Sequence, residues 1–424
     1  MPIVTPAGYY RLDEQSLVAY LAAQPTLAAR LGGESTTWRV SEVGDGNLNL
    51  VFIVEGPAGD LCVKQALPYV RLVGESWPLG LKRAWFEHRA ASIHARCAGA
   101  RLPTPLHYDE RLFLIAMERC RPHVIMRRGM IDGVVYPRFA EQIAAHLAGT
   151  LYFTSDMALP AAEKRGLVAE FSGNTELCKI TEDLIFTDPY MVCERNRWTS
   201  PQLDRAAAEI REDHALKRAI SVLKLKFLGE AQALIHGDLH TGSVMVTESD
   251  TQVIDPEFAV MGPIGFDVGK LLGNLLLCFF SQRGHESAPG ARDAYRQWIL
   301  ETVEAVWNGF TARFLALWRR HPEGDGYPRA LFAGDAGRVS LEQAQSDYLH
   351  RLFQDSLGFA GAAMIRRTLG LAHNIDMEWI ADPDMRGACE LRNLGLAREF
   401  LTNPSVFPTI DAVTARARAL EAPS

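Results

Sequence analysis

Apolar and polar residues alternate over short distances in the first quarter of the chain. Residues 38–43 and 50–54 follow the period of two expected for strands, and the turn residues of 44–49 join them. A second turn at 56–60 leads into a third strand that ends with Lys64. The pattern predicts a three-stranded meander whose first turn contains glycine.

A helix and a fourth strand are expected next. Pro78–Arg96 carries apolar residues among charged ones and begins with proline, which is favoured in the first turn of a helix. Glu87, near the middle of this helix, can pair with Lys64, but it can equally be one of several surface acids. Leu112–Glu118 is apolar up to its final acid and predicts a buried strand.

Beyond Met130 the period is mainly helical. Leu271–Phe280 is apolar but too short to span a bilayer, and Gly273 and Asn274 interrupt it, so it predicts a buried helix. Segments with glycine and proline separate the helices and predict surface loops. The expected helices are 139–148, 223–228, 271–280 and 296–317, and the expected loops are 284–290 and 322–337.

Length and composition narrow the class of protein. With 424 residues the chain exceeds what one core usually supports, so we expect two lobes, 1–118 and 119–424. A content of 48% hydrophobic and 22% charged residues is typical of a soluble globular protein. The net charge of −7 argues against a nucleic-acid partner, since phosphate backbones attract basic proteins. The arginine pairs at 127–128 and 319–320 are isolated, and we expect them on the solvated surface.

The cysteines and the N-terminus indicate a cytoplasmic protein. The 7 cysteines are an odd number and include no Cys-x-x-Cys pair, which is typical of reduced cytosolic thiols. Residues 1–11 lack the basic region and following apolar run of a secretion signal. We therefore expect a cytoplasmic location and no association with a membrane.

Two acidic positions carry the clearest chemistry. The segment 236–240 reads His-Gly-Asp-Leu-His, and an Asp-Pro-Glu segment at 255–257 begins seventeen positions after Asp238. Residues 244–246 predict a short strand between them, so both acids should lie at the mouth of one small hairpin. Phosphoryl transfer needs such a pair, because one carboxylate orients and deprotonates the attacking hydroxyl and the other holds the magnesium that neutralises the ATP phosphates.

The meander adds features that suit a nucleotide. Small turn residues such as Gly44 and Gly46 let backbone N–H groups approach phosphates, and Lys64 can reach back to them from two strands away. A Gly-x-Gly turn between strands is more often a plain hairpin. The lysine at this offset favours the nucleotide interpretation.

Together these motifs resemble the protein-kinase-like small-molecule kinases, the superfamily of aminoglycoside and choline kinases. Within it the sequence is most similar to the methylthioribose kinase family, and the similarity spreads over most of the chain. It rests on 64–71 running into 74–78, on 236–243, and on 255–258 with 262–267. The resemblance implies an α+β, two-lobed protein-kinase-like fold, with a small antiparallel-sheet N-lobe and a larger, mainly helical C-lobe.

The resemblance also implies roles for particular residues. Asp238 would be the general base and a substrate contact, and Asp255 and Glu257 would be ligands of Mg²⁺. ATP would lie under the 44–49 loop, with its adenine at a hinge formed by 117–120. The expected ATP-binding residues are Gly44, Gly46, Asn47, Lys64, Glu87, Met117 and Glu118. The tryptophan-containing segment 74–78 is similar to a mobile loop of that family, although a surface turn is the alternative.

Two positions depart from the broader kinase pattern. Ser243 stands where related kinases have a metal-binding asparagine, and Glu257 stands where protein kinases have glycine. Because magnesium prefers hard oxygen donors, Glu257 can supply the oxygen that the asparagine would have given.

Arg366 and Arg367 are a second place for chemistry, in a segment of small and apolar residues at 360–369. Burying arginine is costly without an acid or anion, so a buried pair would favour a phosphate or carboxylate partner. Successive helical residues point about 100° apart, so one of the two side chains must bend. Solvated arginines are the alternative from the residues alone, whereas the resemblance makes both of them contacts of the substrate and the transition state.

The reaction implied by the resemblance is transfer of the ATP γ-phosphoryl group to the anomeric hydroxyl of 5-methylthioribose, in methionine salvage, by a homodimer. The alternatives are a kinase of the same fold for another alcohol (an aminoglycoside, choline or homoserine) and a catalytically dead, kinase-like binding protein. Arg366 and Arg367 argue against a polycationic substrate. The presence of Lys64, Asp238 and Asp255 argues against a dead kinase.

Overall fold

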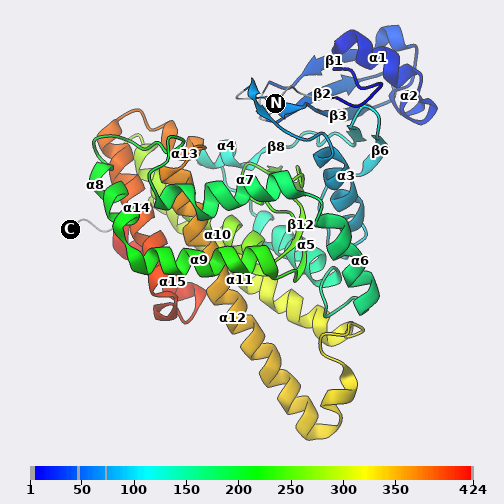
Figure 1. Ribbon diagram of the computed structural model, residues 1–424. Helices are drawn as coiled ribbons and strands as arrows, with labels where there is room; N and C mark the ends of the chain where they lie inside the picture. The colour runs from blue at the N-terminus through cyan, green and yellow to red at the C-terminus, as the bar shows by residue number, and fades with distance from the viewer. Residues whose placement is uncertain (1–4, 45–47, 72–73, 422–424) are drawn as a thin grey trace.

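The computed structural model describes residues 5–44, 48–71 and 74–421. A small part built around a sheet lies at one end, and a larger helical part makes up the rest of the molecule (Figure 1). The strands of the sheet lie between Arg39 and Met117, and the alternating pattern predicted the first three of them.

The main sheet has five antiparallel strands in the order β1–β2–β3–β7–β6. Its strands are β1 (Arg39–Glu42), β2 (Asn49–Glu55), β3 (Asp60–Ala66), β6 (Pro105–Asp109) and β7 (Leu114–Met117). Lys64 lies on the central strand β3, paired with Val51 on β2 and Ile115 on β7. The predicted meander is confirmed, and the lysine is held between two neighbouring strands.

Three helices pack around this sheet. Leu17 and Leu21 of α1 (Glu14–Ala22) and Leu27 of α2 (Pro25–Leu31) share a core with apolar residues of β2 and β3. Neither α1 nor α2 was expected from the sequence. The third helix, α3 (Arg83–His94), packs against β3, β6 and β7.

The expected start of the third helix was wrong. Residues 74–78 form a strand, β5 (Gly74–Pro78), which pairs with β4 (Tyr69–Val70), and the helix begins only at Arg83. The proline disfavours helical backbone at the residue before it, Trp77, so Pro78 ends an extended segment here instead of opening a helix.

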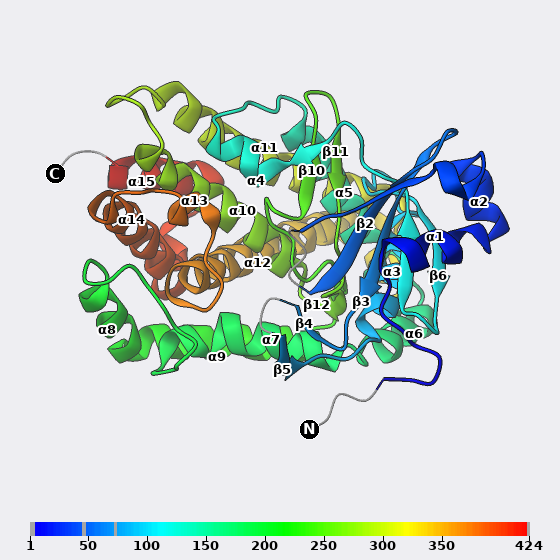
Figure 2. The same cartoon turned by 90° about the horizontal axis from the view of Figure 1, so that it is seen from above.

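The helical part is organised around α10 (Ile264–Ser281), which runs beside α12 (Gly334–Leu369) (Figure 2). By length and composition alone, 264–284 could cross a membrane, but every residue of α10 within it is buried inside the protein. The predicted buried helix is confirmed. α11 (Asp293–Arg320) and α14 (Pro383–Thr402) also pack against α10.

The expected loop 322–337 is shorter than predicted, because α12 begins at Gly334 and its first turns extend away from the body of the molecule (Figure 1). Gly334 has a φ of +75°, which glycine adopts readily at the entry to a helix.

The remaining elements complete the helical part. The helices are α4 (Met126–Ile131), α5 (Phe139–Phe153), α6 (Ala161–Phe171), α7 (Thr175–Phe186), α8 (Asp204–Glu212), α9 (His214–Gly229), α13 (Ile375–Glu378) and α15 (Ile410–Glu421). The 3₁₀ turns are η1 (Ser35–Thr37), η2 (Asp188–Tyr190), η3 (Gln282–Gly284), η4 (Arg329–Phe332) and η5 (Pro404–Val406). The short strands are β8 (Val124–Ile125), β9 (Ala233–Ile235), β10 (Val244–Val246), β11 (Thr251–Val253) and β12 (Val260–Gly262).

The small hairpin predicted between the two acidic positions is confirmed. β10 and β11 pair antiparallel, and the Ile254 N–H donates to the Ser243 carbonyl at 2.9 Å just beyond the strands. Asp238 precedes the hairpin and Asp255 follows it, so both acids lie at its open end.

Candidate active site

Lys64 links the sheet to the acidic segment after β11. Its Nζ lies 2.6 Å from Glu87 Oε1 on α3 and forms an ion pair with Asp255 Oδ1. Glu87 is only 2% exposed, so it is not a surface acid. Burial disfavours the charged ammonium, but Asp255 and Glu87 outweigh it and raise the pKa of Lys64. The lysine therefore carries its positive charge at the site.

Three carboxylates converge beside Lys64. Oxygen atoms of Glu87, Asp255 and Glu257 all lie within 4.8 Å of one another. Burial, with the neighbouring Asp255, raises the pKa of Glu257 to about 8. Hard oxygen donors crowded in this way are the ligands that Mg²⁺ prefers, and a divalent cation would relieve their repulsion. The residues present therefore fit a magnesium site.

The backbone of Asp255 is strained. Its φ is +71°, in the left-handed region that residues other than glycine rarely adopt. Such strain persists where the surrounding structure imposes it, often at functional sites. Here it accompanies the contact between the Asp255 carboxylate and Lys64.

Residues of the N-terminal part reach across to Glu257. Asn49 Nδ2 donates to Glu257 Oε2 at 2.9 Å, and Asn49 Oδ1 accepts from Arg83 Nη2 at 2.9 Å. Arg83 Nε lies 3.6 Å from Glu257 Oε2. Asn174 Nδ2 donates to the Glu257 carbonyl at 2.9 Å. Neither Arg83 nor Asn174 was expected at the site from the sequence.

The loop that carries Asp238 is anchored on α10. The Asp267 carboxylate accepts the His236 N–H at 2.6 Å and the Gly237 N–H at 3.0 Å. Gly237 has a φ of +79°, and a Cβ there would lie 2.1 Å from the Phe258 carbonyl oxygen. Only glycine fits at this position, which brings the Asp238 loop against the segment after Glu257.

Two histidines fix this loop. His236 Nδ1 accepts the Asp238 N–H at 3.2 Å, so its Nε2 carries the proton and donates to the Ile254 carbonyl at 2.9 Å. His240 Nδ1 likewise accepts the Gly242 N–H at 3.0 Å, which leaves Nε2–H facing Asp238 Oδ2 at 3.4 Å. His236 thus ties the Asp238 loop to the residue before Asp255.

The Ser243 hydroxyl forms hydrogen bonds within the same loop. Its Oγ accepts the His240 N–H at 2.9 Å and lies 3.0 Å from the Asp238 carbonyl, to which it can donate. A hydroxyl used in this way shapes the loop. This arrangement suits the interpretation that Glu257, and not position 243, supplies the second metal oxygen.

Asp238 lies among cations. Lys270 of α10 forms an ion pair with Asp238 Oδ1. Burial would raise the pKa of Asp238, but Lys270 and His240 outweigh it and hold the pKa well below its ordinary value. Burial lowers the pKa of His240 to about 3. Near neutral pH Asp238 is therefore ionised and His240 is neutral.

Arg366 and Arg367 are not solvated surface residues. Arg367 is 8% exposed and Arg366 is half-buried, and their Nη1 atoms donate to the same Ala372 carbonyl at 3.2 and 3.1 Å. Asp238 is close enough to act electrostatically on both. Burial lowers the pKa of each guanidinium, and Arg366 lowers that of Arg367 further, so this region favours an anion.

The expectation that both arginine pairs lie on the surface was wrong for one residue, Arg127, whereas Arg128 is exposed. Arg127 is 9% exposed. It donates to Thr241 Oγ1 at 3.1 Å and to Asn274 Oδ1 at 3.0 Å, and its Nε lies 3.2 Å from Asp376 Oδ2. Buried partners offset the cost of burying this guanidinium. Residues 319–320 are exposed, as expected.

Comparisons with known proteins identify the family of the chain. Residues 39–310 match the model of the phosphotransferase enzyme family. Methylthioribose kinase 1 of Oryza sativa subsp. japonica is 47% identical over 407 residues, which cover 96% of this chain and 94% of that protein. A methylthioribose kinase of Escherichia coli O45:K1 is 45% identical over 414 residues, covering 97% and 98%. The chain belongs to the methylthioribose kinase family.

The family membership confirms that the protein is a kinase with the expected α+β, two-lobed, protein-kinase-like fold. Among solved structures, an ethanolamine kinase of Plasmodium vivax aligns with a TM-score of 0.45 and 11% identity, over 91% of this chain and 90% of that chain.

The nucleotide-binding residues expected in this kinase are described in part. Gly44 lies in the turn after β1, whereas Gly46 and Asn47 lie outside the described residues. Met117 ends β7, between Cys62 of β3 and Pro105 of β6. The Glu118 N–H donates to the Thr104 carbonyl at 3.0 Å, and the Glu118 side chain pairs with Arg30 at 2.9 Å. An adenine at this hinge would therefore have to use other backbone groups than the Glu118 N–H.

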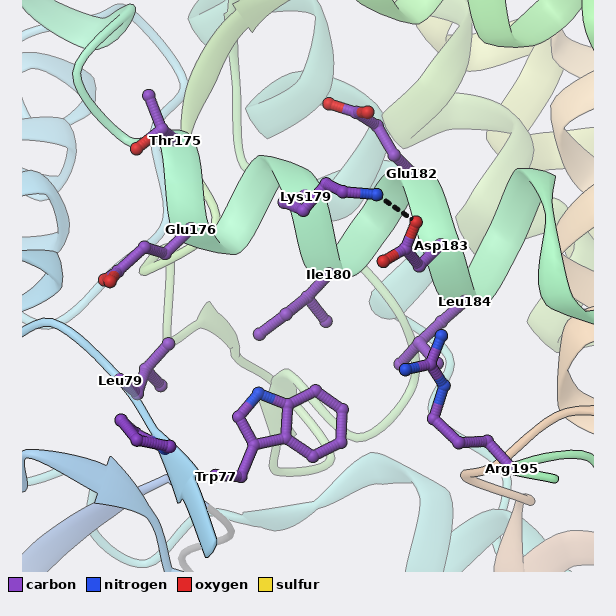
Figure 3. Close-up of a pocket in the computed structure, with 11 residues that line it drawn as sticks. Trp77, Leu79, Thr175, Glu176, Lys179, Ile180, Glu182, Asp183, Leu184 and Arg195 are labelled. Atoms are coloured by element: carbon purple, nitrogen blue, oxygen red, sulfur yellow. Dashed lines mark hydrogen bonds and ion pairs between the residues drawn. The ribbon is translucent and has the colours of Figure 1, made fainter. Parts of the chain in front are cut away.

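A cavity of about 610 Å³ lies in this kinase between β5 and α7 (Figure 3). Trp77 and Leu79 line one side, and Ile180 lies on the facing surface of α7. The cavity adjoins the segment that carries Asp255 and Glu257, since Trp77 and Ile180 pack in the same apolar cluster as Phe258. The tryptophan segment therefore lies next to the candidate active site and is not an isolated surface turn.

Proposed function

We propose that the protein transfers the γ-phosphoryl group of ATP to the anomeric hydroxyl of 5-methylthioribose, giving 5-methylthioribose 1-phosphate and ADP. The relatives that carry the name methylthioribose kinase match nearly the whole chain. The observation that carries the proposal is the position of Asp238. His236 joins the Asp238 loop to the segment before Asp255, and the Asp238 carboxylate acts on the half-buried Arg366 and the buried Arg367.

The phosphates of ATP would be bound from the N-terminal side of the site. Lys64, held by Glu87, contacts them with its ammonium group. Asp255 and Glu257 would hold Mg²⁺, which would neutralise charge on the ATP phosphates. Asn49 and Arg83 keep the Glu257 carboxylate in place. Gly44, Gly46, Asn47, Met117 and Glu118 complete the proposed ATP site.

Asp238 acts mainly by positioning the acceptor. A carboxylate with a depressed pKa is a weak base, and a sugar hydroxyl keeps its proton until late in a loose transition state. Asp238 accepts a hydrogen bond from the anomeric hydroxyl, aims its oxygen at the γ-phosphorus and takes the proton as the new bond forms.

Arg366 and Arg367 would face the group in transfer. Their burial without a full complement of acids favours an anion, and their planar guanidinium groups match phosphoryl oxygens. Each would offset charge on the phosphoryl group, as an arginine finger does. The same two cations disfavour choline or an aminoglycoside as the acceptor.

We also propose a cytoplasmic homodimer that acts in methionine salvage, with its two lobes divided between residues 118 and 119. The family resemblance supports these points. All seven cysteines lie in described segments and are free thiols.

The test is ADP release by the purified protein with Mg-ATP and 5-methylthioribose, ribose, choline or kanamycin, with the Asp238→Ala variant as the blank. Turnover on methylthioribose that exceeds turnover on the other three alcohols supports the proposal. Turnover on another alcohol alone would keep the kinase and reject the substrate. An absence of turnover on all four would reject the activity.

A further inference from the structure

Helix α10 presents a row of polar side chains from an otherwise apolar, fully buried helix. Asp267, Lys270 and Asn274 are three and four positions apart, so they lie on one face. Asp267 and Lys270 are the charged residues of α10, and they are 2% and 5% exposed. Burying both charges is costly unless each has a partner, and each finds one in the Asp238 loop.

Lys270 contacts the reacting side chain directly. Its ammonium group pairs with Asp238 Oδ1 and donates to the Gly237 carbonyl at 3.3 Å. The face of the Phe266 ring lies 5.3 Å from the same nitrogen. Three partners on two segments thus fix this ammonium group, while Asp267 holds the backbone of the same loop.

We propose that Lys270 is a positioning residue of the phosphoryl transfer, whose charged ammonium group holds the Asp238 carboxylate in the orientation that receives the acceptor hydroxyl. The inference rests on the proposed function, because it assigns Lys270 a part in that reaction. Without the positive charge, Asp238 would lose its ion-pair partner and face the acceptor in several orientations, and such misplacement lowers turnover.

The surroundings make the charge of Lys270 sensitive to pH. The charged and titratable groups around it are Asp238 and His240 of the loop, Asp267 of α10, Arg366 and Arg367 of α12, and, next to these arginines, Arg127 of α4 and Asp376 of α13. Burial, opposed by Asp238 and assisted by Arg366, lowers the pKa of Lys270 to about 8.

The lowered pKa of Lys270 predicts how activity depends on pH. The active form carries protonated Lys270, so kcat/KM for 5-methylthioribose should fall as the pH rises through about 8, approaching tenfold per pH unit. An arginine at position 270 keeps its charge throughout this range. The descending limb should therefore be absent from Lys270→Arg, which should retain measurable turnover.

The experiment measures kcat and KM from pH 6 to 10 for the wild type, Lys270→Arg, Lys270→Met and a control. We expect Lys270→Met to lower kcat roughly 10²-fold and to leave the KM for ATP nearly unchanged. Its pH profile should also lack the descending limb. The control is Lys226→Met, which removes a lysine paired with Asp355 at 2.8 Å elsewhere in the same part of the protein and should keep the wild-type profile.

The outcomes separate the inference from the proposed function. A wild type without turnover on methylthioribose would reject both. An active wild type whose descending limb persists in Lys270→Arg would overturn the inference alone, as would Lys270→Met with wild-type kcat. If Lys270→Met does not fold, as judged by circular dichroism, the profile of Lys270→Arg decides.

Discussion

Replacing Asp267 with alanine tests whether α10 holds the loop that carries Asp238. The Asp267 carboxylate is 2% exposed and accepts the N–H groups of His236 and Gly237 at 2.6 and 3.0 Å. Alanine removes both acceptors and leaves two buried backbone donors without a partner. The variant should therefore lose stability and, because the loop shifts, turnover.

The magnitude follows from the two donors. An unsatisfied buried group costs about 1–3 kcal/mol, so two would cost roughly 2–6 kcal/mol. This loss of stability is partly offset. Burial raises the pKa of Asp267, so burying its carboxylate destabilises the wild type, and the alanine variant no longer buries a carboxylate there. We expect the free energy of unfolding to fall by about 2–4 kcal/mol, and kcat to fall about 10²-fold at temperatures where the variant is folded.

Urea unfolding followed by tryptophan fluorescence measures the first quantity, and ADP release measures the second. Asp267→Asn keeps one acceptor oxygen and should fall between alanine and the wild type in both. The matched control is Asp335→Ala, in which the side chain removed is fully exposed and makes one distant contact, 3.6 Å from Arg338. This control should unfold and turn over as the wild type does. Asp267→Ala with wild-type stability and kcat would refute the anchoring role.

Three further predictions concern the substrate, the metal and the pH dependence of stability. Arg367→Ala should lower kcat by at least about 10³-fold, and the exposed Arg320→Ala should not change it; equal effects of the two would contradict a role in transfer. Glu257→Gln should raise the Mg²⁺ concentration for half-maximal rate by roughly tenfold or more, and an unchanged Mg²⁺ titration would remove it from the metal site. Burial lowers the pKa of His94 to about 4, so the unfolded chain takes up a proton that the folded chain does not as the pH falls from 6.5 to 4. The free energy of unfolding should therefore fall between pH 6.5 and 4 by up to about 1.4 kcal/mol per pH unit for this histidine. In His94→Gln the melting temperature should depend less on pH than it does in the wild type. The same pH dependence of the melting temperature in both proteins would contradict this prediction.

The parts of the structure that local sequence could predict were those set by short-range pattern. The alternation of apolar and polar residues over 38–64 predicted the meander, because each strand buries one face. The hairpin between Asp238 and Asp255 followed from a short apolar run between two turns. The pairing of Lys64 with Glu87 was left open, since burial of an acid on a helix depends on what packs over it.

The failures came from long-range contacts. Pro78 was taken as the start of a helix, and pairing with Tyr69 drew it into a strand instead. Arg127 was expected on the surface, since two adjacent arginines give no sign of buried partners such as Asp376.

Asp267 was noted only as part of a motif, and Lys270 was missed. A signal for both was present in the sequence, because charged residues three positions apart in a long apolar helix must have buried partners. That pattern indicates a polar site, but it does not identify the loop that supplies the partners. Residues 236–238 are about thirty positions away along the chain, and only the fold brings them to α10.

The most direct test of the proposed reaction is the structure of the product formed from 5-methylthioribose and Mg-ATP, determined by phosphorus NMR. We expect one new phosphate ester whose phosphorus couples to the anomeric proton, formed by the wild type and not by Asp238→Ala. A new ester whose phosphorus does not couple to the anomeric proton, or the same ester formed at the same rate by Asp238→Ala, would contradict the proposed reaction.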